Sequence, residues 1–356
     1  MHIGIVTLPI HDNYGMILQN YALQKVLRSL GHTPITLNFL YPTPLWRVVL
    51  STCKTLLLYF IPGRRCSFSS YRVKQSPQIK VFVDKYIIRT RPIRRYTRRL
   101  LCKYRIEGLI VGSDQVWRPR FNRYLEDMFL RFAQHEKIRK VAYAASFGVG
   151  TLEFSERQLQ RCAPLLQQFD KVSVREASGV DLCRNYFHVE AEHVLDPTLL
   201  LDHSDYERLC AEVPRRTEKF MACYILDSTE EQRRHIDRMA QQMHMTTKYF
   251  TSYHSSLTVE EWLAMFRDAA YVVTDSFHGT VFSIIFGKPF TTILNKDRGE
   301  DRFTSLLRML SLEKCLISSV KELPEELYNW HMNDAVDAVL SLARKAAKIY
   351  LQDALK

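Results

Sequence analysis

Short apolar runs alternate with amphipathic stretches along the chain, and most of the apolar runs end in a polar cluster. The first run, His2–Leu8, is apolar and rich in β-branched residues, which predicts a buried parallel strand. Apolar residues then recur at helical spacing over Met16–Leu30, and Gly31 follows as a helix C-cap would. Thr33–Leu40 predicts the next strand. This order of strand, helix and strand is a βαβ unit, which opens a doubly wound sheet.

The same alternation resumes after residue 105 and predicts two parallel sheets in tandem. Strands of the first sheet are expected to continue at 106–111, 140–146, 171–174 and 193–195, and those of the second at 220–226, 248–251, 271–274 and 290–294. Helices are expected at 260–269, 280–286 and 335–355. Apolar density falls and charge rises between Leu201 and Lys219. We therefore predict an α/β protein with one Rossmann-like domain over 1–205, a second over 206–330, and a terminal segment, 331–356, that packs back on the first domain.

Two polar turns of the first domain are candidates for binding a sugar, because ligands bind beyond the carboxyl ends of parallel strands. Asn13, Gly15 and Gln19 follow the first strand, and Gly15 would let a ligand approach the backbone. An ordinary turn with an Asn cap is the alternative interpretation. The turn after 106–111 would either build a sugar pocket or serve only as a turn and helix cap; its candidates are Ser113, Asp114, Gln115 and Trp117, with the indole stacked on the sugar ring.

The turn between the expected strand 271–274 and the following apolar helix is a candidate anion site. Ser276, Thr280 and backbone amides would surround the helix N-terminus, which favours phosphate. His278 could contact that phosphate or donate a proton, although a lone histidine is more often structural. Arg175 would either pair locally with Glu176 or present its planar fork to a carboxylate or phosphate. Four residues after the next strand could also close over the anion, or they could be solvated residues of a loop. They are Asn295, Lys296, Arg298 and Arg302.

Charge is concentrated in one region of the chain. The formal net charge is +12, which favours anionic partners. Residues 64–105 contain a single acid, Asp84, and follow an apolar stretch at 45–61. This insertion, 45–105, is either a solvated segment whose apolar side packs on the domain or an interfacial segment on an anionic inner membrane leaflet. Nucleic acid is not expected as a partner, because no reader motif with interleaved aromatic residues is present.

The cysteines and apolar runs indicate a cytoplasmic protein. None of the eight cysteines is spaced as CxxC, which favours free thiols in a reducing compartment over a zinc site or a disulfide framework. No apolar run reaches 18 residues, and no basic region precedes the first run. We expect no metal, and the basic insertion could hold the protein at the inner face of the membrane.

Seven motifs occur in an order that resembles one family over about residues 3–312. They are GIVTLPIHDNYGMILQNYAL, VGSDQVW, YAASFG, VREASG, VLDPTLL, TDSFHGTVFSIIFGKPF and NKDRGEDRFTSLL. Together they resemble the bacterial polysaccharide pyruvyl transferase family. The resemblance implies a GT-B arrangement of two Rossmann-type domains. It also implies phosphoenolpyruvate as co-substrate, no cofactor, and formation of a ketal on two hydroxyls of one sugar in a surface polysaccharide, such as a capsule or exopolysaccharide, or in its lipid-linked precursor.

The resemblance also implies roles for individual residues. His278 matches the family's histidine, and the contacts to the donor anion would fall on Ser276, Gly279, Thr280, Arg175 and Arg302, with Asn295 beside them. As a mechanistic hypothesis, His278 binds the donor phosphate and acts as the acid, and Asp114 is the candidate base. The insertion would influence the choice of acceptor. A sugar-nucleotide-dependent glycosyltransferase and a non-catalytic scaffold remain the alternative functions.

Overall fold

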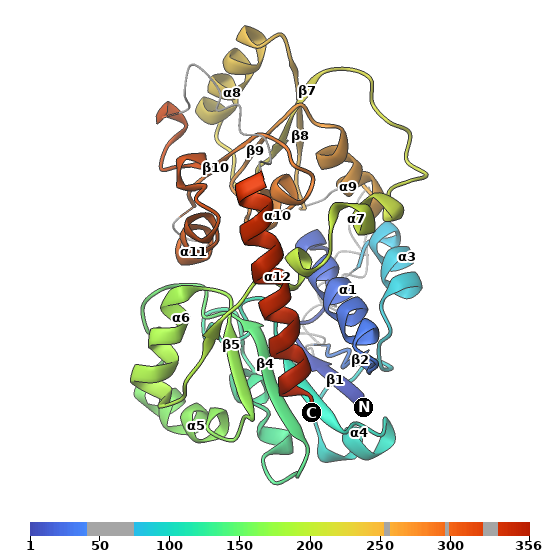
Figure 1. Ribbon diagram of the computed structural model, residues 1–356, viewed down its shortest axis with the longest axis vertical. Helices are drawn as coiled ribbons and strands as arrows, with labels where there is room; N and C mark the ends of the chain where they lie inside the picture. Colours follow the sequence, from blue (N-terminus) through green and yellow to red (C-terminus); the bar gives the residue numbers. More distant parts are fainter. Residues whose placement is uncertain (41–74, 253–256, 296–298, 323–333) are drawn as a thin grey trace, which may run out of the picture.

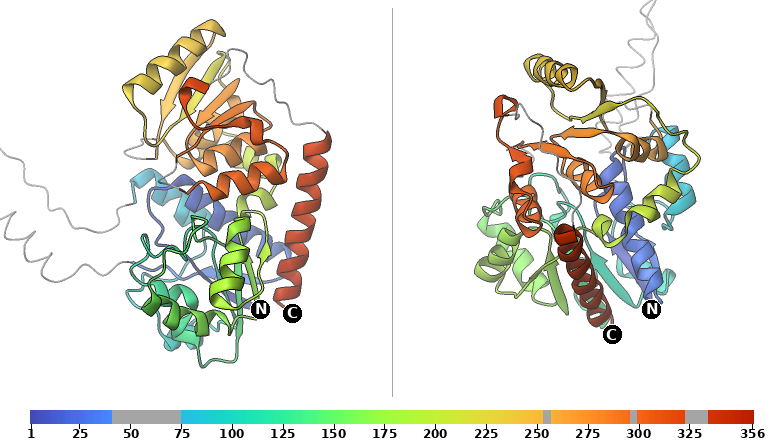
Figure 2. Two further views of the ribbon diagram at one scale, coloured as in Figure 1. Left: turned by 90° about the vertical axis from the view of Figure 1, so that its left-hand side faces the viewer. Right: turned by 45° about the horizontal axis from the view of Figure 1, so that its top comes forward.

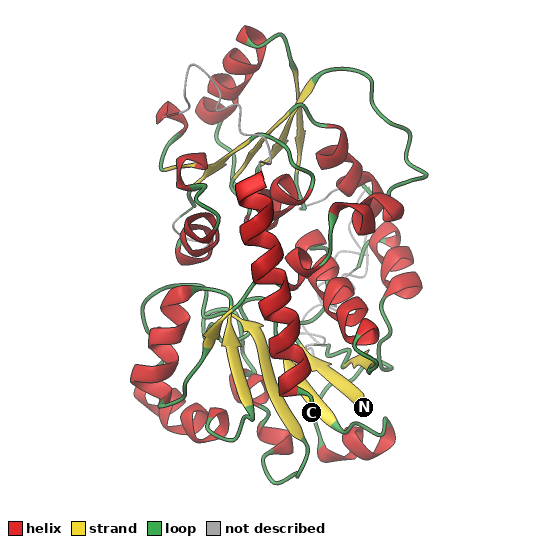
Figure 3. Cartoon of the chain, viewed as in Figure 1, coloured by secondary structure: helices red, strands yellow, loops and turns green. Residues whose placement is uncertain are grey.

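The computed structural model describes residues 1–40, 75–252, 257–295, 299–322 and 334–356 (Figure 1). All strand pairings are parallel and build two sheets, with helices packed around them (Figure 3). The first sheet has the order β2-β1-β3-β4-β5-β6. Its strands are β1 (His2–Val6), β2 (Thr33–Thr36), β3 (Gly108–Val111), β4 (Arg139–Ala145), β5 (Lys171–Val174) and β6 (Glu192–His193). The predicted strands are confirmed, several of them shorter than expected.

The second sheet repeats the strand order of the first. Its order is β11-β10-β9-β7-β8, so the strand that comes first in the chain, β7, again lies inside the sheet, with the next strand, β8, at its edge. The strands are β7 (Phe220–Tyr224), β8 (Thr246–Phe250), β9 (Tyr271–Thr274), β10 (Phe290–Ile293) and β11 (Leu316–Ile317). β11 has only two residues and was not predicted. Strand order reverses between β1 and β3 and between β7 and β9, and such switch points are where open α/β sheets bind ligands.

Helices cover the sheets, and several begin with a side-chain cap that the sequence encodes. The main helices are α1 (Tyr14–Ser29), α3 (Pro77–Tyr86), α4 (Arg98–Lys103), α5 (Glu156–Leu166), α6 (Ala177–Leu182), α7 (His203–Leu209), α8 (Glu230–Gln242), α9 (Val259–Asp268), α10 (Phe277–Ile285), α11 (Asp301–Met309) and α12 (Asp334–Ala354). In α5, α8 and α9 a Ser or Thr cap and a Gln or Glu three residues later satisfy each other's backbone amides. These capping boxes explain where the three helices start.

The terminal helix α12 returns to the first domain, as predicted. Tyr350 donates a hydrogen bond to the carbonyl of Ala142 in β4 (2.9 Å), and Arg344 donates to the carbonyl of Leu199 (2.6 Å). Figure 2 shows α12 along one side of the molecule, from the second domain to the far end of the first. The boundary at 205/206 falls within α7 and the boundary at 330/331 falls outside the described residues, so both stay predictions.

The described half of the basic insertion lies beside the first sheet. Residues 41–74, and with them the apolar stretch at 45–61, lie outside the described residues. The remainder forms α3 and α4. α3 buries its apolar face, including Phe82, against Tyr21 of α1, with ring centroids 6.1 Å apart. This part follows the first interpretation, in which the apolar side packs on the domain.

Across the described residues, no helix is both long enough and apolar enough to span a membrane. The six described cysteines are free; five are buried and Cys102 is exposed. Burial raises the pKa of several of these thiols, such as Cys315 to about 11, so they stay protonated near neutral pH.

Candidate functional site

The N-terminus of α10 faces the first domain through His278. Ser276 caps the helix by accepting a hydrogen bond from the amide of Gly279 (3.5 Å). His278 is 8% exposed, and its ring lies directly against Gly15 of α1. A Cβ on Gly15 would lie 2.0 Å from Nδ1 of His278. Because a side chain cannot occupy that space, a glycine at this position is what allows the imidazole to sit against the opposite domain.

The two domains touch directly on either side of this contact. The ring of Tyr14 stacks on that of Trp262 with centroids 5.2 Å apart, and its hydroxyl donates to the carbonyl of Leu257 (2.8 Å). The amide of Ala177 donates to Oγ of Ser305 (3.0 Å). These contacts hold the carboxyl ends of the two sheets against each other, in the GT-B arrangement that the family resemblance implies.

Asp196 connects the first domain to His278 and is a site residue that was not predicted from the sequence. Its Oδ2 lies 4.0 Å from Nε2 of His278 and accepts a hydrogen bond from Ser113 Oγ (3.2 Å). Its Oδ1 accepts from the amide and hydroxyl of Thr198 (3.0 and 2.6 Å). The available signal was its position directly after an expected strand, at 193–195.

Arg175 is buried and bridges two carboxylates within the first domain. Its Nη1 donates to Asp196 (2.8 Å) and its Nη2 lies 3.5 Å from Asp114, while the side chain is 1% exposed. Its guanidinium also lies over the ring of Phe277, 4.8 Å from the centroid. The predicted local pair with Glu176 therefore needs correction, because the carboxylates that face the fork come from two other loops. Its Nε has no hydrogen-bond partner among the described residues, so the predicted contact of Arg175 with a donor anion stays a prediction.

Arg302 is the cation that the second domain contributes. It lies in α11, buried, 5.4 Å over the ring of Phe277. Burial, followed by the positive charge of Arg175, lowers the pKa of Arg302 to about 10, so the guanidinium remains charged at neutral pH. Its location at the interface agrees with the predicted role as an anion contact.

Charge states in the cluster are set by burial. Burial lowers the pKa of His278 to about 4 despite the opposing effect of Asp196, so the imidazole is neutral near pH 7. Its Nε2 has no hydrogen-bond partner among the described residues. Burial alone would raise the pKa of Asp114, but Arg175, His278 and Arg302 hold it below its usual range. Asp114 is therefore an ionised carboxylate. His278 could act as a proton donor only if a change around its ring raised the pKa of the imidazole.

Glu176 is a second buried carboxyl group that the prediction did not assign to the site. It accepts hydrogen bonds from the amides of Phe147 (2.6 Å) and Gly148 (3.1 Å). Burial raises its pKa, against the opposing charges of Arg175 and Arg302. Glu176 thus fixes the turn after β4 at the domain interface.

Gln19 lies one helical turn after Gly15, on the same face of α1. Its side chain is buried, and neither its Nε2 nor its Oε1 has a hydrogen-bond partner among the described residues. A buried amide without partners carries a free-energy cost, which a ligand hydroxyl could remove. The predicted role of Gln19 in binding the sugar substrate therefore fits its surroundings and stays a prediction.

Trp117 does not face a ligand, and its predicted stacking on a sugar is wrong. The side chain is 0% exposed, its Nε1 donates to the carbonyl of Met128 (3.1 Å), and its ring stacks on Phe129 with centroids 5.2 Å apart. The indole belongs to the core of the first domain.

The predicted anion contact of the Thr280 hydroxyl is also wrong, whereas that of the Ser276 hydroxyl stays a prediction. Thr280 is 0% exposed, and its Oγ1 pairs with Oγ1 of Thr292 in β10 (2.7 Å). Gly279 allows α10 to pack on β9, because a Cβ there would lie 2.1 Å from Oγ1 of Thr274. Besides the Ser276 hydroxyl, this turn can offer an anion its backbone amides, since the first amides of a helix have no intrahelical acceptor.

Four further predicted residues make hydrogen bonds within the chain. Their partners are Met16 N for Asn13 Oδ1 (3.1 Å), Ala144 O for Ser113 Oγ (3.0 Å), Arg118 Nη1 for Gln115 Oε1 (3.0 Å), and Asp227 Oδ2 for Asn295 Nδ2 (2.9 Å). Asn13 is the cap of α1, as the alternative interpretation had it. Lys296 and Arg298 lie outside the described residues.

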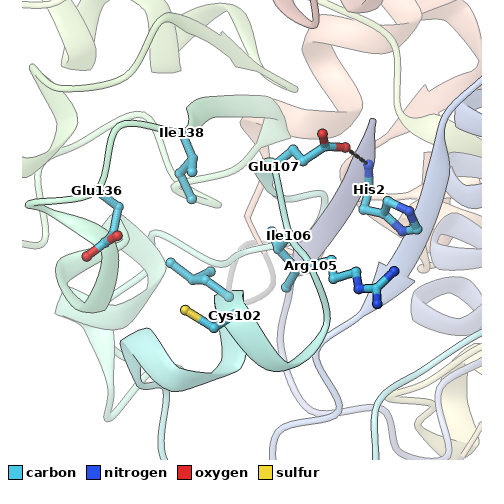
Figure 4. A pocket seen from close by; sticks show the side chains of 8 residues that line it. His2, Cys102, Arg105, Ile106, Glu107, Glu136 and Ile138 are labelled. Atoms are coloured by element: carbon cyan, nitrogen blue, oxygen red, sulfur yellow. Dashed lines mark hydrogen bonds between the residues drawn. The ribbon is translucent and has the colours of Figure 1, made fainter.

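A separate surface pocket of about 420 Å³ lies at the other end of the first sheet, where its strands begin (Figure 4). It is lined by His2, Arg105 and Glu107 among others, which lie at the amino ends of β1 and β3. Because open α/β sheets bind ligands at the carboxyl ends of their strands, we place the functional site at His278 and not in this pocket.

Comparison with known proteins gives a family and a fold. The model of a family described as polysaccharide pyruvyl transferase matches residues 79–297, which is more than half of the chain. No curated protein matches the sequence. The fold is similar to that of a UDP-GlcNAc 2-epimerase from Neisseria meningitidis bound to UDP-GlcNAc, at 10% identity and a TM-score of 0.53, over 100% of this chain and 99% of the other. It is also similar to a UDP-glucosyltransferase from Polygonum tinctorium, at 10% identity and a TM-score of 0.50, over 99% and 96% of the two chains. These likenesses confirm the GT-B fold.

Proposed function

The chain belongs to the polysaccharide pyruvyl transferase family, and we propose that it transfers the pyruvyl group of phosphoenolpyruvate onto two hydroxyls of a sugar. The sugar would belong to a surface polysaccharide or its lipid-linked precursor. Membership in the family makes the protein a transferase of polysaccharide biosynthesis. The donor, the ketal product and the acceptor class are the proposal.

One observation carries the proposal: the switch points of both sheets meet at His278. The loops after β1 and β3 bring Gly15 and Asp114 to it from the first domain, and the turn after β9 begins α10 on the second. The start of α10 and the buried Arg302 give the second-domain side a positive potential. That side suits a small anion such as phosphoenolpyruvate, and the first-domain side, with Gln19, suits a neutral polyol.

The chemistry balances without a further reactant. A proton adds to the CH₂ carbon of phosphoenolpyruvate, which makes C2 electrophilic, and one sugar hydroxyl forms a bond to C2. The C2–O bond to phosphate breaks, and the second hydroxyl closes the ketal. Of the two hydroxyl protons, one balances the new methyl group and the other leaves with inorganic phosphate.

His278 and Asp114 are the side chains we assign to these proton movements. The ionised Asp114 can accept a hydroxyl proton. The neutral His278 can donate one N–H to a donor phosphate oxygen, and a phosphate held there would raise the pKa of the imidazole because an adjacent negative charge favours its protonated form. In the free protein His278 is neutral and is not yet the acid expected from the sequence, so the acid role depends on bound donor.

Release of inorganic phosphate from phosphoenolpyruvate tests the proposal. We expect release only in the presence of an acceptor, measured over a panel of galactosides and N-acetylhexosamines. His278→Ala should lower turnover by roughly 10²–10⁴-fold, whereas the control His135→Ala, at an exposed position of the first domain, should leave it unchanged. Equal phosphate release by both variants would reject the assignment of His278.

The same assay separates the alternative functions. The fold is shared with a UDP-glucosyltransferase, so consumption of a sugar nucleotide in place of phosphoenolpyruvate would indicate a glycosyltransferase. Turnover of neither donor would indicate a scaffold in polysaccharide assembly.

A further inference from the structure

A face of the first domain carries exposed cations and no acid along its own segment. Residues 91–105 contain seven basic side chains and neither Asp nor Glu. All seven are exposed: Arg91, Arg94, Arg95, Arg98, Arg99, Lys103 and Arg105. We call these seven residues the basic face. Nothing in the proposed reaction uses them.

The segment is anchored, so its charges are held on a rigid support. Its apolar residues Leu100 and Leu101 are buried in the first domain. The ring of Tyr96 stacks on Phe39 (4.9 Å between centroids) and on Phe132 (5.2 Å). The apolar side therefore faces inward and is not available to enter a bilayer, while the basic side chains all point to solvent.

Few carboxylates neutralise this charge. In the part of the chain that the structure describes, only Arg98 of the seven lies within ion-pair distance of a carboxylate, that of Glu136 (2.6 Å). The other six of the seven cations therefore carry charge that no ion pair among the described residues neutralises.

The basic face runs from the edge of the first sheet to the end of the domain. Isolated bridges pair Thr36 with Arg89 and Phe39 with Ile93, so the start of the segment follows the chain beyond the carboxyl end of β2. α4 then lies at the end of the first domain farthest from the second domain (Figure 1). The part of the basic face on α4 could therefore contact a flat partner without the second domain touching it.

We propose that the basic face binds the surface of an anionic bilayer. Each Lys or Arg close to such a surface strengthens binding by about fivefold, and seven of them act together on one support. Binding would be electrostatic, without insertion, and would weaken as salt rises. Single-stranded nucleic acid fits less well, because the adjacent aromatic rings cannot stack on bases: Tyr96 is buried and Lys103 covers Tyr104 at 5.3 Å.

Vesicle sedimentation of the full-length protein tests this inference. The variant replaces Arg94, Arg95, Arg99 and Lys103 by Gln and leaves the Arg98–Glu136 pair intact. The control variant removes the same charge elsewhere by replacing the exposed Arg157, Arg234, Arg238 and Lys314 by Gln. On vesicles containing one third phosphatidylglycerol, the first variant should bind roughly 600-fold more weakly than wild type, fivefold for each of the four residues, and the control should lose far less. Wild type should not bind vesicles of phosphatidylcholine alone.

Several results would overturn the inference. These are equal loss by the two variants, equal binding to neutral and anionic vesicles, and tighter binding of a single-stranded RNA oligonucleotide than of anionic vesicles at the same salt. Far-ultraviolet circular dichroism and phosphate release in solution, with a water-soluble acceptor, check that the first variant is folded. Because none of the four replaced residues lies at His278, a failure of the membrane inference leaves phosphate release intact and is distinguishable from a failure of the proposed function.

Discussion

Gly15 and His278 occupy adjoining positions across the domain interface, and only a glycine leaves room for the ring: a Cβ at residue 15 would lie 2.0 Å from Nδ1 of the imidazole. We predict that Gly15→Ala displaces the ring and lowers kcat/KM by at least tenfold. Stability should fall with it by about 1–3 kcal/mol, because the added methyl group overpacks a buried contact. Steady-state kinetics and urea unfolding check the two effects.

A double-mutant cycle supplies the control for this prediction. If Gly15→Ala acts through the imidazole, it should cause no further loss in a His278→Ala background. Fully additive losses would mean that residue 15 acts independently of His278.

The neutral state of His278 predicts a loss of stability in mild acid. The pKa of His278 is about 4 in the folded protein, below its usual 6.5, so the unfolded chain binds more protons between these values. Stability is then fully present above pH 6.5 and falls as the pH drops toward 4. Between pH 7 and pH 5 the free energy of unfolding should fall by on the order of 2 kcal/mol more in wild type than in His278→Gln. Parallel pH dependences of the two proteins would contradict the assignment of a neutral imidazole.

Asp196 should be essential to the stability of the cluster. Asp196→Asn removes the charge that faces Nη1 of Arg175 and leaves a buried guanidinium less compensated, which should cost about 3–5 kcal/mol of unfolding free energy. The matched control is Glu190→Gln, which breaks the solvent-exposed pair with Arg184 and should cost less than about 1 kcal/mol. Chemical denaturation measures both variants. Similar small losses would show that the buried pair contributes little.

Trp117 offers a test of core against ligand roles. Trp117→Phe keeps the aromatic stacking on Phe129 but removes the hydrogen bond to the Met128 carbonyl, so the free energy of unfolding should fall by about 1–3 kcal/mol. The KM for the acceptor should not change, because the indole is inaccessible. A rise in this KM without loss of stability would restore the sugar-stacking role.

Gln19 should behave in the opposite way. Replacing it by Met, which has a similar volume, removes a buried amide that has no partner among the described residues, so stability should stay constant or rise by about 1 kcal/mol. The KM for the acceptor should rise severalfold, since the amide is then missing when a hydroxyl arrives. A variant that is clearly destabilised, with unchanged KM, would place Gln19 among the structural residues.

The positions of the site loops were predictable because they follow from strand order. A continuous β-branched run followed by Asn13 and Gly15, and another followed by Ser276 and His278, fixed both turns at the carboxyl ends of strands. Side-chain direction within the turns was not predictable. Thr280 lies four residues after Ser276, on the face of α10 that packs toward β10, so its hydroxyl pairs with Thr292.

Side-chain partners that come from distant loops also could not be predicted from the sequence. Arg175 was expected to pair with the adjacent Glu176, but the fold brings Asp114 and Asp196 to it from 61 and 21 residues away. From the sequence alone, the indole of Trp117 could equally face outward. In the structure the short helical turn that carries Met128 and Phe129 covers it. Such contacts depend on how separate segments pack, which local spacing does not encode.

The division of charged groups between the domains has a kinetic consequence. Arg302 and the start of α10, which would hold the donor, both belong to the second domain, whereas Gln19 and Asp114 belong to the first. Arg175, bound to Asp114 and Asp196, stays with that other side. Under the proposed function, phosphoenolpyruvate would be held mainly by the second domain and the polyol mainly by the first, so the rate of transfer should depend on how the two domains pack against each other.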